Sequence, residues 1–107
     1  MYCLTVTYPI GEDTRFDSDY YRDQHMPLCA RLFADFGYRG SVLRTNQGKA
    51  PGSGDLNYAS VDLLFDSLEQ LQAALSAGGK EVSADLVNYT NAKPMMSFSE
   101  VDVEFAD

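Results

Sequence analysis

The stretch "YPIGEDTRFDSDYYRDQHMPL", residues 8 to 28, joins the end of a predicted strand to the start of a predicted helix. Pro9 and the glycine two residues later stop the strand. Phe16 and Asp17 then match a hydrophobic residue followed by a helix N-cap, with Tyr21 at the position where Phe16 can pack against it. We therefore expect a helix from Asp17 to about residue 37.

Strand patterns lie on both sides of this helix. The segment "YCLTVTY", residues 2–8, alternates large apolar or aromatic residues with smaller ones, which is the period of a strand. Residues 39–45 form a second predicted strand, and "YASVDLLF", residues 58–65, alternates again and forms a third. Between them, "NQGKAPGSGD", residues 46–55, has the glycine and proline content of a surface loop.

The second half of the chain predicts two helical segments and a last strand. Ser67 to Gln70 fit a capping box, and leucines follow at helical spacing up to Gly78 and Gly79, where we expect this helix to end. A short further helix is expected next, with one face formed by Val82, Leu86 and Tyr89. The last strand covers residues 95–105, and its alternation changes phase near residues 99–100, which predicts a bulge there.

The resulting order, β-α-β-β-α-β, is the α+β ferredoxin-like plan with a four-stranded antiparallel sheet, and it accounts for residues 1–107 as one domain. In this plan the helices cover one face of the sheet. The other face carries small, polar and apolar residues in mixture, so we expect it to pack against a second copy of the chain. The alternative is a solvated face with a few stray apolar residues.

Composition excludes several classes of function. The net charge is −8, with 16 acidic and 8 basic residues, which argues against nucleic acid or an anionic membrane as partner. Cys3 and Cys29 have neither the spacing nor the companion ligands of a zinc site, and no nucleotide-binding motif is present. We therefore expect no metal and no cofactor. Without a signal or membrane-spanning segment, the sequence predicts a cytoplasmic protein.

His25 is the only histidine and lies in the predicted first helix. At 100° per residue it shares an apolar stripe with Tyr21, Leu28, Leu32 and Phe36, so it should point toward the sheet. Pro27 cannot donate a backbone hydrogen bond, so the helix should be interrupted beside the histidine. Such an interruption can leave room for a small molecule between helix and sheet.

A buried carboxylate needs a partner, and Asp85 is expected on the inward side of the second helical unit. The candidate partners are His25 and the arginines at positions 22, 31, 39 and 44. If His25 takes this role, the pair is a general base oriented by a carboxylate, with the imidazole pKa near or above its reference of ~6.5. The alternative is a hydrogen-bonded core histidine without catalytic role.

Two blocks of this sequence resemble the EthD family, named for a protein encoded with an ethyl tert-butyl ether degradation system. The family pattern is a strand ending in Tyr-Pro, a Phe-Asp pair, two tyrosines and His-x-Pro-Leu, followed later by an Asp, an Asn, an aromatic residue and a Thr. The matching residues here are Tyr8, Pro9, Phe16, Asp17, Tyr20, Tyr21, His25, Pro27 and Leu28, and then Asp85, Asn88, Tyr89 and Thr90.

The resemblance implies a dimeric α+β barrel, in which the open sheet faces of two ferredoxin-like subunits pack together and each subunit has a pocket between sheet and helices. Relatives in the wider superfamily include cofactor-free monooxygenases, lactone isomerases, polyketide cyclases and heme-degrading enzymes. The lack of tryptophan and of a second histidine weakens the last reading and the multi-histidine cyclase reading. Fold alone does not decide among the others.

The leading hypothesis is a cofactor-independent enzyme of small-molecule catabolism or polyketide-type metabolism, an oxidoreductase (monooxygenase), isomerase or lyase, that acts on a small apolar or aromatic carbonyl compound. His25 is the expected general acid/base, Tyr21 and Tyr8 are expected to donate hydrogen bonds to an oxygen that gains charge, and Asp85 is expected to orient the histidine. The expected wall residues are Leu28, Leu32, Val61, Tyr89, Met96 and Phe98. The rival hypothesis is a small-molecule carrier or an accessory protein of an oxygenase system.

Overall fold

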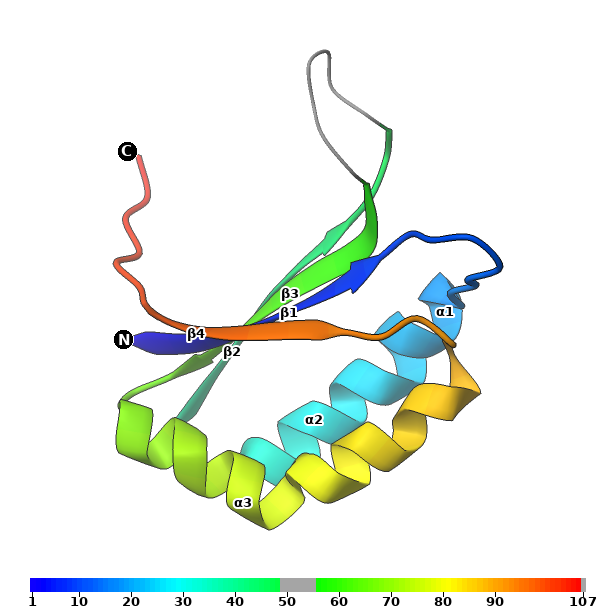
Figure 1. The fold of residues 1–107 in the computed structure, drawn as a ribbon. Coiled ribbons are helices and arrows are strands. Elements are labelled where there is room, and N and C mark those ends of the chain that lie inside the picture. Colours follow the sequence, from blue (N-terminus) through cyan, green and yellow to red (C-terminus); the bar gives the residue numbers. More distant parts are fainter. Residues whose placement is uncertain (49–55, 107) are drawn as a thin grey trace.

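Four antiparallel strands form one sheet in the order β2-β3-β1-β4 (Figure 1). Strands β1 (Tyr2–Pro9) and β3 (Asn57–Phe65) lie at its centre, with β2 (Tyr38–Thr45) and β4 (Met95–Glu100) at its edges. This computed structural model describes residues 1–48 and 56–106. Residues 49–55 of the predicted surface loop lie outside the described part of the chain.

Two helical units cover one face of the sheet (Figure 1). The first consists of α1 (Ser18–Tyr20), the π-helical turn η1 (Tyr21–His25) and α2 (Met26–Phe33). The second consists of α3 (Leu68–Ala84) and the 3₁₀ turn η2 (Asp85–Asn88). This arrangement confirms the predicted α+β ferredoxin-like fold.

The core lies between the sheet and the helices. Successive strand residues point to opposite faces, so every second side chain of a strand faces the helices. On β1, Leu4, Val6 and Tyr8 are buried on the helix side, and on β3 the same side includes Val61 and Phe65. The opposite face carries polar side chains, among them Thr5, Thr7, Ser60 and Asp62, which form hydrogen bonds across β1 and β3. One face is therefore covered and the other is open, as the sequence predicts.

The first helical unit begins as its sequence indicates. The Asp17 carboxylate accepts a hydrogen bond from the Tyr20 backbone N–H at 3.0 Å, and the rings of Phe16 and Tyr21 pack with centroids 5.1 Å apart. The unit ends at Phe33, earlier than the predicted residue 37. Gly37 has φ +68°, a left-handed conformation that only glycine adopts without strain, and it leads the chain into β2.

The interruption predicted beside His25 is a π turn, which spans Tyr21–His25 and ends just before Pro27, in the first turn of α2. The Met26 backbone N–H donates to the carbonyl of Tyr21, five residues back, instead of the four of an α-helix. This turn holds one more residue than an α-helical turn. The inward-facing positions after His25 therefore shift by one, from the predicted Leu28 and Leu32 to Cys29 and Phe33, which are both buried.

The predicted helix end at Gly78 and Gly79 is wrong, since α3 continues through both glycines to Ala84. Gly78 serves packing instead. A Cβ atom there would lie 3.1 Å from Cβ of Leu32 and 3.4 Å from the Phe33 ring, so its absence lets α2 and α3 approach closely. The predicted short third helix is accordingly the end of α3 followed by η2.

The predicted continuation of the last strand to residue 105 is also wrong. Strand β4 ends at Glu100, which pairs with Tyr2, the first residue of β1. The Val101 N–H still donates to the carbonyl of Met1 at 2.8 Å, but residues 102–106 pair with no strand in the described part of the chain. The change of phase near residues 99–100 therefore marks the end of the strand and not a bulge.

Candidate functional site

Backbone contacts bring the two sequence blocks together at one end of the sheet. Phe16 and Thr90 form an isolated β-bridge, and the Asp17 N–H donates to the Tyr89 carbonyl at 2.7 Å. The Thr90 hydroxyl also donates to the carbonyl of Arg15 at 2.7 Å. The loop before α1 is thus fastened to the segment after η2, which places η1 and η2 side by side.

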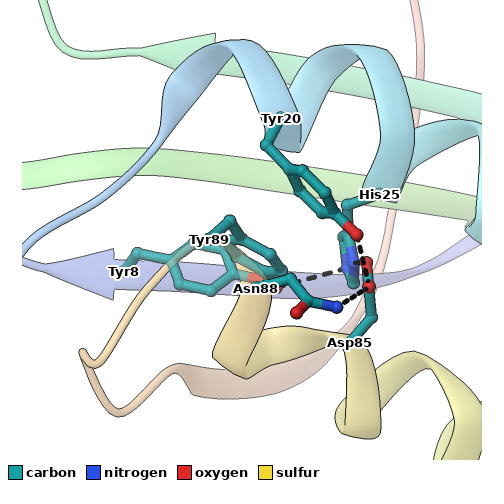
Figure 2. A network of polar contacts seen from close by, with 6 residues as sticks. All are labelled: Tyr8, Tyr20, His25, Asp85, Asn88 and Tyr89. Carbon is teal, nitrogen blue, oxygen red and sulfur yellow. Dashed lines mark hydrogen bonds and ion pairs between the residues drawn. The ribbon is translucent and has the colours of Figure 1, made fainter.

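His25 and Asp85 form the centre of a polar network (Figure 2). His25 is 3% exposed, and its Nδ1 donates to the Asp85 carboxylate at 2.9 Å. The other oxygen of that carboxylate accepts from the Tyr20 hydroxyl at 2.7 Å and from the Asn88 amide at 2.8 Å. Among the candidate partners of Asp85, the structure therefore selects His25. Tyr20 and Asn88 were missed as polar partners, although both lie in the EthD-like blocks.

Three tyrosines lie on the other side of the imidazole. The Tyr89 hydroxyl is 3.3 Å from His25 Nε2 and 2.8 Å from the Tyr8 hydroxyl. Because Nδ1 donates to Asp85, Nε2 is the acceptor of this contact. Tyr21 stacks on His25 with ring centroids 5.3 Å apart, yet its buried hydroxyl has no hydrogen-bond partner among the described residues. Burying a hydroxyl without a partner is costly, so this hydroxyl is free to donate to an acceptor oxygen placed beside it.

A cavity of about 250 Å³ lies between the sheet and the helices. Its wall is mostly apolar, and none of its described lining residues is Asp, Glu, Lys or Arg. The lining residues whose side chains carry polar atoms are His25, the three tyrosines, Cys29 and Ser83. At Met96 and Ser83 the lining is exposed, so the cavity opens to solvent between α3 and β4.

The expected pocket residues are only partly found there. Tyr8, Tyr21, His25, Val61, Tyr89 and Met96 line the cavity. Leu28 and Leu32 do not, because the π turn rotates Cys29 and Phe33 into their place. Phe98 does not either: it pairs with Leu4 on the helix side of the sheet but is 53% exposed, because no helix covers edge strand β4 at this point. Lining residues not expected from the sequence are Leu4, Val6, Met26, Leu63, Leu75, Gly79, Val82, Ser83, Leu86 and Pro94.

The electrostatics of the pair differ from the expectation. Burial lowers the pKa of His25 and outweighs the Asp85 carboxylate, so the predicted value near or above ~6.5 is wrong. Burial acts to raise the pKa of Asp85, but hydrogen bonds from Asn88, His25 and Tyr20 hold it below its usual value. At neutral pH the site therefore contains a neutral imidazole beside a carboxylate. Burial also raises the pKa of the Cys29 thiol to about 12, which makes it a poor nucleophile.

The lowered pKa of His25 predicts that the fold loses stability as the pH falls. Below ~6.5 the unfolded chain takes up a proton on this histidine before the folded chain does, so acidification favours unfolding. Asp85 causes a second loss of stability nearer pH ~4, because its carboxylate takes up a proton in the unfolded chain before it does so in the folded chain. Urea unfolding at several pH values measures this. His25→Gln should remove the first step and keep the second, and an unchanged profile would contradict the assignment.

Within residues 1–48 and 56–106, no group of three or more His, Cys, Asp or Glu side chains is placed to hold a metal ion. None of the helices in the same part of the chain is both long and apolar enough to cross a membrane.

The ferredoxin-like fold, and the two sequence blocks that bring His25 and Asp85 together, define the class of protein. The EthD domain family matches residues 11–93, and the chain belongs to this family. An EthD-like protein from Ralstonia eutropha JMP134 has 32% sequence identity and a TM-score of 0.84, over 98% of this chain and 95% of that one. No curated protein matches the sequence.

Two more distant structures share the fold alone. A dimeric ferredoxin-like protein of unknown function from Thermobifida fusca YX has 12% identity and a TM-score of 0.62, over 94% of this chain and 90% of that one. SnoaB, a cofactor-independent oxygenase from Streptomyces nogalater, has 12% identity and a TM-score of 0.57, over 99% of this chain and 96% of that one.

Proposed function

We propose that this protein is a cofactor-independent enzyme that removes and returns a proton on a small apolar or aromatic carbonyl compound. One observation carries the proposal: a neutral imidazole, held at Nδ1 by a carboxylate, lines an apolar cavity. A positioned histidine of this kind is a general base. Membership of the EthD family fits a role in small-molecule catabolism.

The proposed reaction begins with a carbon acid bound in the cavity. Nε2 of His25 takes the proton from a carbon next to the carbonyl group, displacing its long 3.3 Å contact with the Tyr89 hydroxyl. The electron pair of the broken C–H bond moves to the carbonyl oxygen, which becomes an enolate. Tyr21 donates to that oxygen with its unpartnered hydroxyl, and Tyr8 lies beside it. Asp85 keeps the proton on Nδ1 and stabilises the imidazolium that forms.

Removal of this proton is a first step shared by isomerases, lyases and cofactor-free oxygenases, so the reaction type beyond it is left open. None of the described lining residues is Asp, Glu, Lys or Arg, which favours an uncharged ligand, because a ligand carboxylate buried there would have no Lys or Arg among them to pair with. SnoaB is described as a cofactor-independent oxygenase, which supports the compatibility of this fold with such chemistry. A ligand with one oxygen and an otherwise apolar body fits the cavity best.

The second candidate function is a carrier, or an accessory protein of an oxygenase system. The contact between Tyr89 and Nε2 favours it, because this contact already satisfies the histidine without a ligand. In this case His25 and Tyr21 would only anchor the bound molecule.

Exchange of carbon-bound hydrogen for deuterium separates the two functions. The protein in deuterium oxide would be mixed with a panel of neutral aryl ketones, cyclic ketones and lactones, and the signal next to the carbonyl followed by NMR. An enzyme should exchange this hydrogen faster as the pH rises through the lowered pKa of His25. Binding of the same compounds without exchange would support the carrier.

We also propose a homodimer built on the open face of the sheet. This face includes half-exposed Val42 and the polar group Thr5, Arg44 and Asp62, in which Asp62 accepts from both other side chains. The Thermobifida fusca protein of the same fold is described as dimeric. Light scattering should give twice the 11.9 kDa of one chain, with an interface above ~1,200 Å² in total. A monomer at micromolar concentration would contradict this proposal.

A further inference from the structure

The cavity is elongated, with its polar groups at one end. On β1 the lining runs from Tyr8 to Leu4, four residues or about 13 Å along a strand. In the second helical unit it runs from Leu86 in η2 back to Gly79 in α3, seven residues or about 10 Å along the helical axis, and on to Leu75. Near Tyr8 and Leu86 lie His25 and the other tyrosines, whereas the far end is lined by apolar residues.

Gly79 is one of the residues that line the cavity. Neither its backbone conformation nor its surroundings require a glycine at this position. It sits inside α3, and its φ is not among the positive values found in the described residues. A Cβ atom added to it would meet only the Leu75 side chain, at 3.8 Å, which is ordinary contact. Glycine inside a helix destabilises the helix relative to alanine. The missing side chain therefore lowers stability and, at this position, leaves open space in the cavity wall.

Gly78 shows the contrast. Its Cβ would lie 3.1 Å from Cβ of Leu32, so the close approach of α2 and α3 requires this glycine. The two neighbouring glycines thus differ in what they face: Gly78 faces α2, and Gly79 faces the cavity.

We infer that Gly79 is a specificity-determining residue, which makes room for the apolar tail of an uncharged, elongated ligand whose oxygen lies at the tyrosine end. The tail runs from His25 toward Gly79, Leu75 and Phe33, and its length is limited by the side chain at position 79. This inference rests on the proposed function for the position of the oxygen, but not for any catalytic step.

A series of 4-alkylphenols, from phenol to 4-hexylphenol, measures the depth of the cavity by calorimetric titration. In the native protein the affinity should rise about fourfold per added methylene, the factor that ~0.8 kcal/mol per buried CH₂ corresponds to, until the tail reaches the end of the cavity. Gly79→Leu should leave phenol binding unchanged and lose tenfold or more for the longest member that the native protein binds. Gly79→Ala should shorten the accepted tail by less.

Alkylbenzenes of the same lengths separate this inference from the proposed function. If they bind as tightly as the phenols and Gly79→Leu rejects the long ones, Gly79 keeps its role and the proposed role of Tyr21 fails. If neither series binds the native protein, or if the native affinity does not depend on length, the inference is overturned. The inference is also overturned if Gly79→Leu and the native protein bind the compounds with the longest tails equally tightly.

Thermal unfolding without ligand gives an independent test. Gly79→Ala should raise the Tm by about 2–8 °C, because alanine favours the helix and nothing crowds its methyl group. Gly78→Ala, the matched control, should lower the Tm because its methyl group crowds Leu32. A lower Tm for Gly79→Ala would show that Gly79 is needed for packing and would overturn the inference.

Discussion

His25→Ala should lower the rate of hydrogen–deuterium exchange in a bound carbonyl compound by about 10²–10⁴-fold, with the fold retained. The imidazole is the only neutral base among the described residues that line the cavity, and its Nε2 is the atom that would take the proton. After the change Asp85 keeps two hydrogen bonds, from Tyr20 and Asn88, so its carboxylate is not stranded. NMR exchange rates and circular dichroism on the same samples measure both parts.

Two further variants make this result specific. Gln24→Ala lies in the same π turn with an exposed side chain, and it should leave the exchange rate unchanged. Asp85→Asn keeps the size of the side chain but no longer holds the proton on Nδ1, so it should reduce the rate by less than the loss of His25 and change its pH dependence. An exchange rate in His25→Ala equal to that of the native protein would remove the histidine from the mechanism.

Phe65→Ala should lower the free energy of unfolding by about 3–5 kcal/mol. Phe65 has no exposed surface and lies on central strand β3, with its ring 5.9 Å from that of Phe33 and 5.4 Å from that of Tyr38. Removing it leaves a cavity where the sheet, α2 and β2 meet, and these parts are too tightly connected to close it. Since domains of this size have about 5–15 kcal/mol in total, urea unfolding should show a partly unfolded population at low denaturant.

The same substitution at Phe105 is the matched control. Phe105 is 86% exposed and lies beyond the end of β4, so Phe105→Ala should change the unfolding free energy by no more than about 0.5 kcal/mol. If Phe65→Ala and Phe105→Ala lowered the free energy of unfolding by similar amounts, the assignment of Phe65 to the core would be wrong.

Most of the fold could be predicted from local signals. The alternation in residues 2–8 and 58–65 predicts the two central strands, and each signal lies within a few neighbouring residues. The N-caps at Asp17 and Ser67 are local in the same sense, since each side chain accepts from a backbone N–H three residues later. Apart from the end of the first helical unit, the errors concern Gly78 and the end of β4, where the deciding partner, Leu32 or Tyr2, is far away in the sequence.

The sequence predicted the main polar residues of the candidate site but only part of its apolar wall. The inward stripe and Pro27 located His25 and Tyr21, and the need of a buried carboxylate for a partner pointed to Asp85. The wall was less predictable, because a single extra residue in a π turn moves every later side chain by one position.

The sequence by itself therefore determined the order of the elements, the face of each strand that is buried, and the residues available for acid–base chemistry, because periodicity and capping act over a few residues. Only the tertiary structure decided that Asp85 pairs with His25, that the Tyr21 hydroxyl has no partner among the described residues, and that Gly79 borders the cavity and not a helix end. It also decided the direction of the pKa of His25, since burial and a carboxylate act on it in opposite senses and their balance depends on how the whole chain packs around the ring.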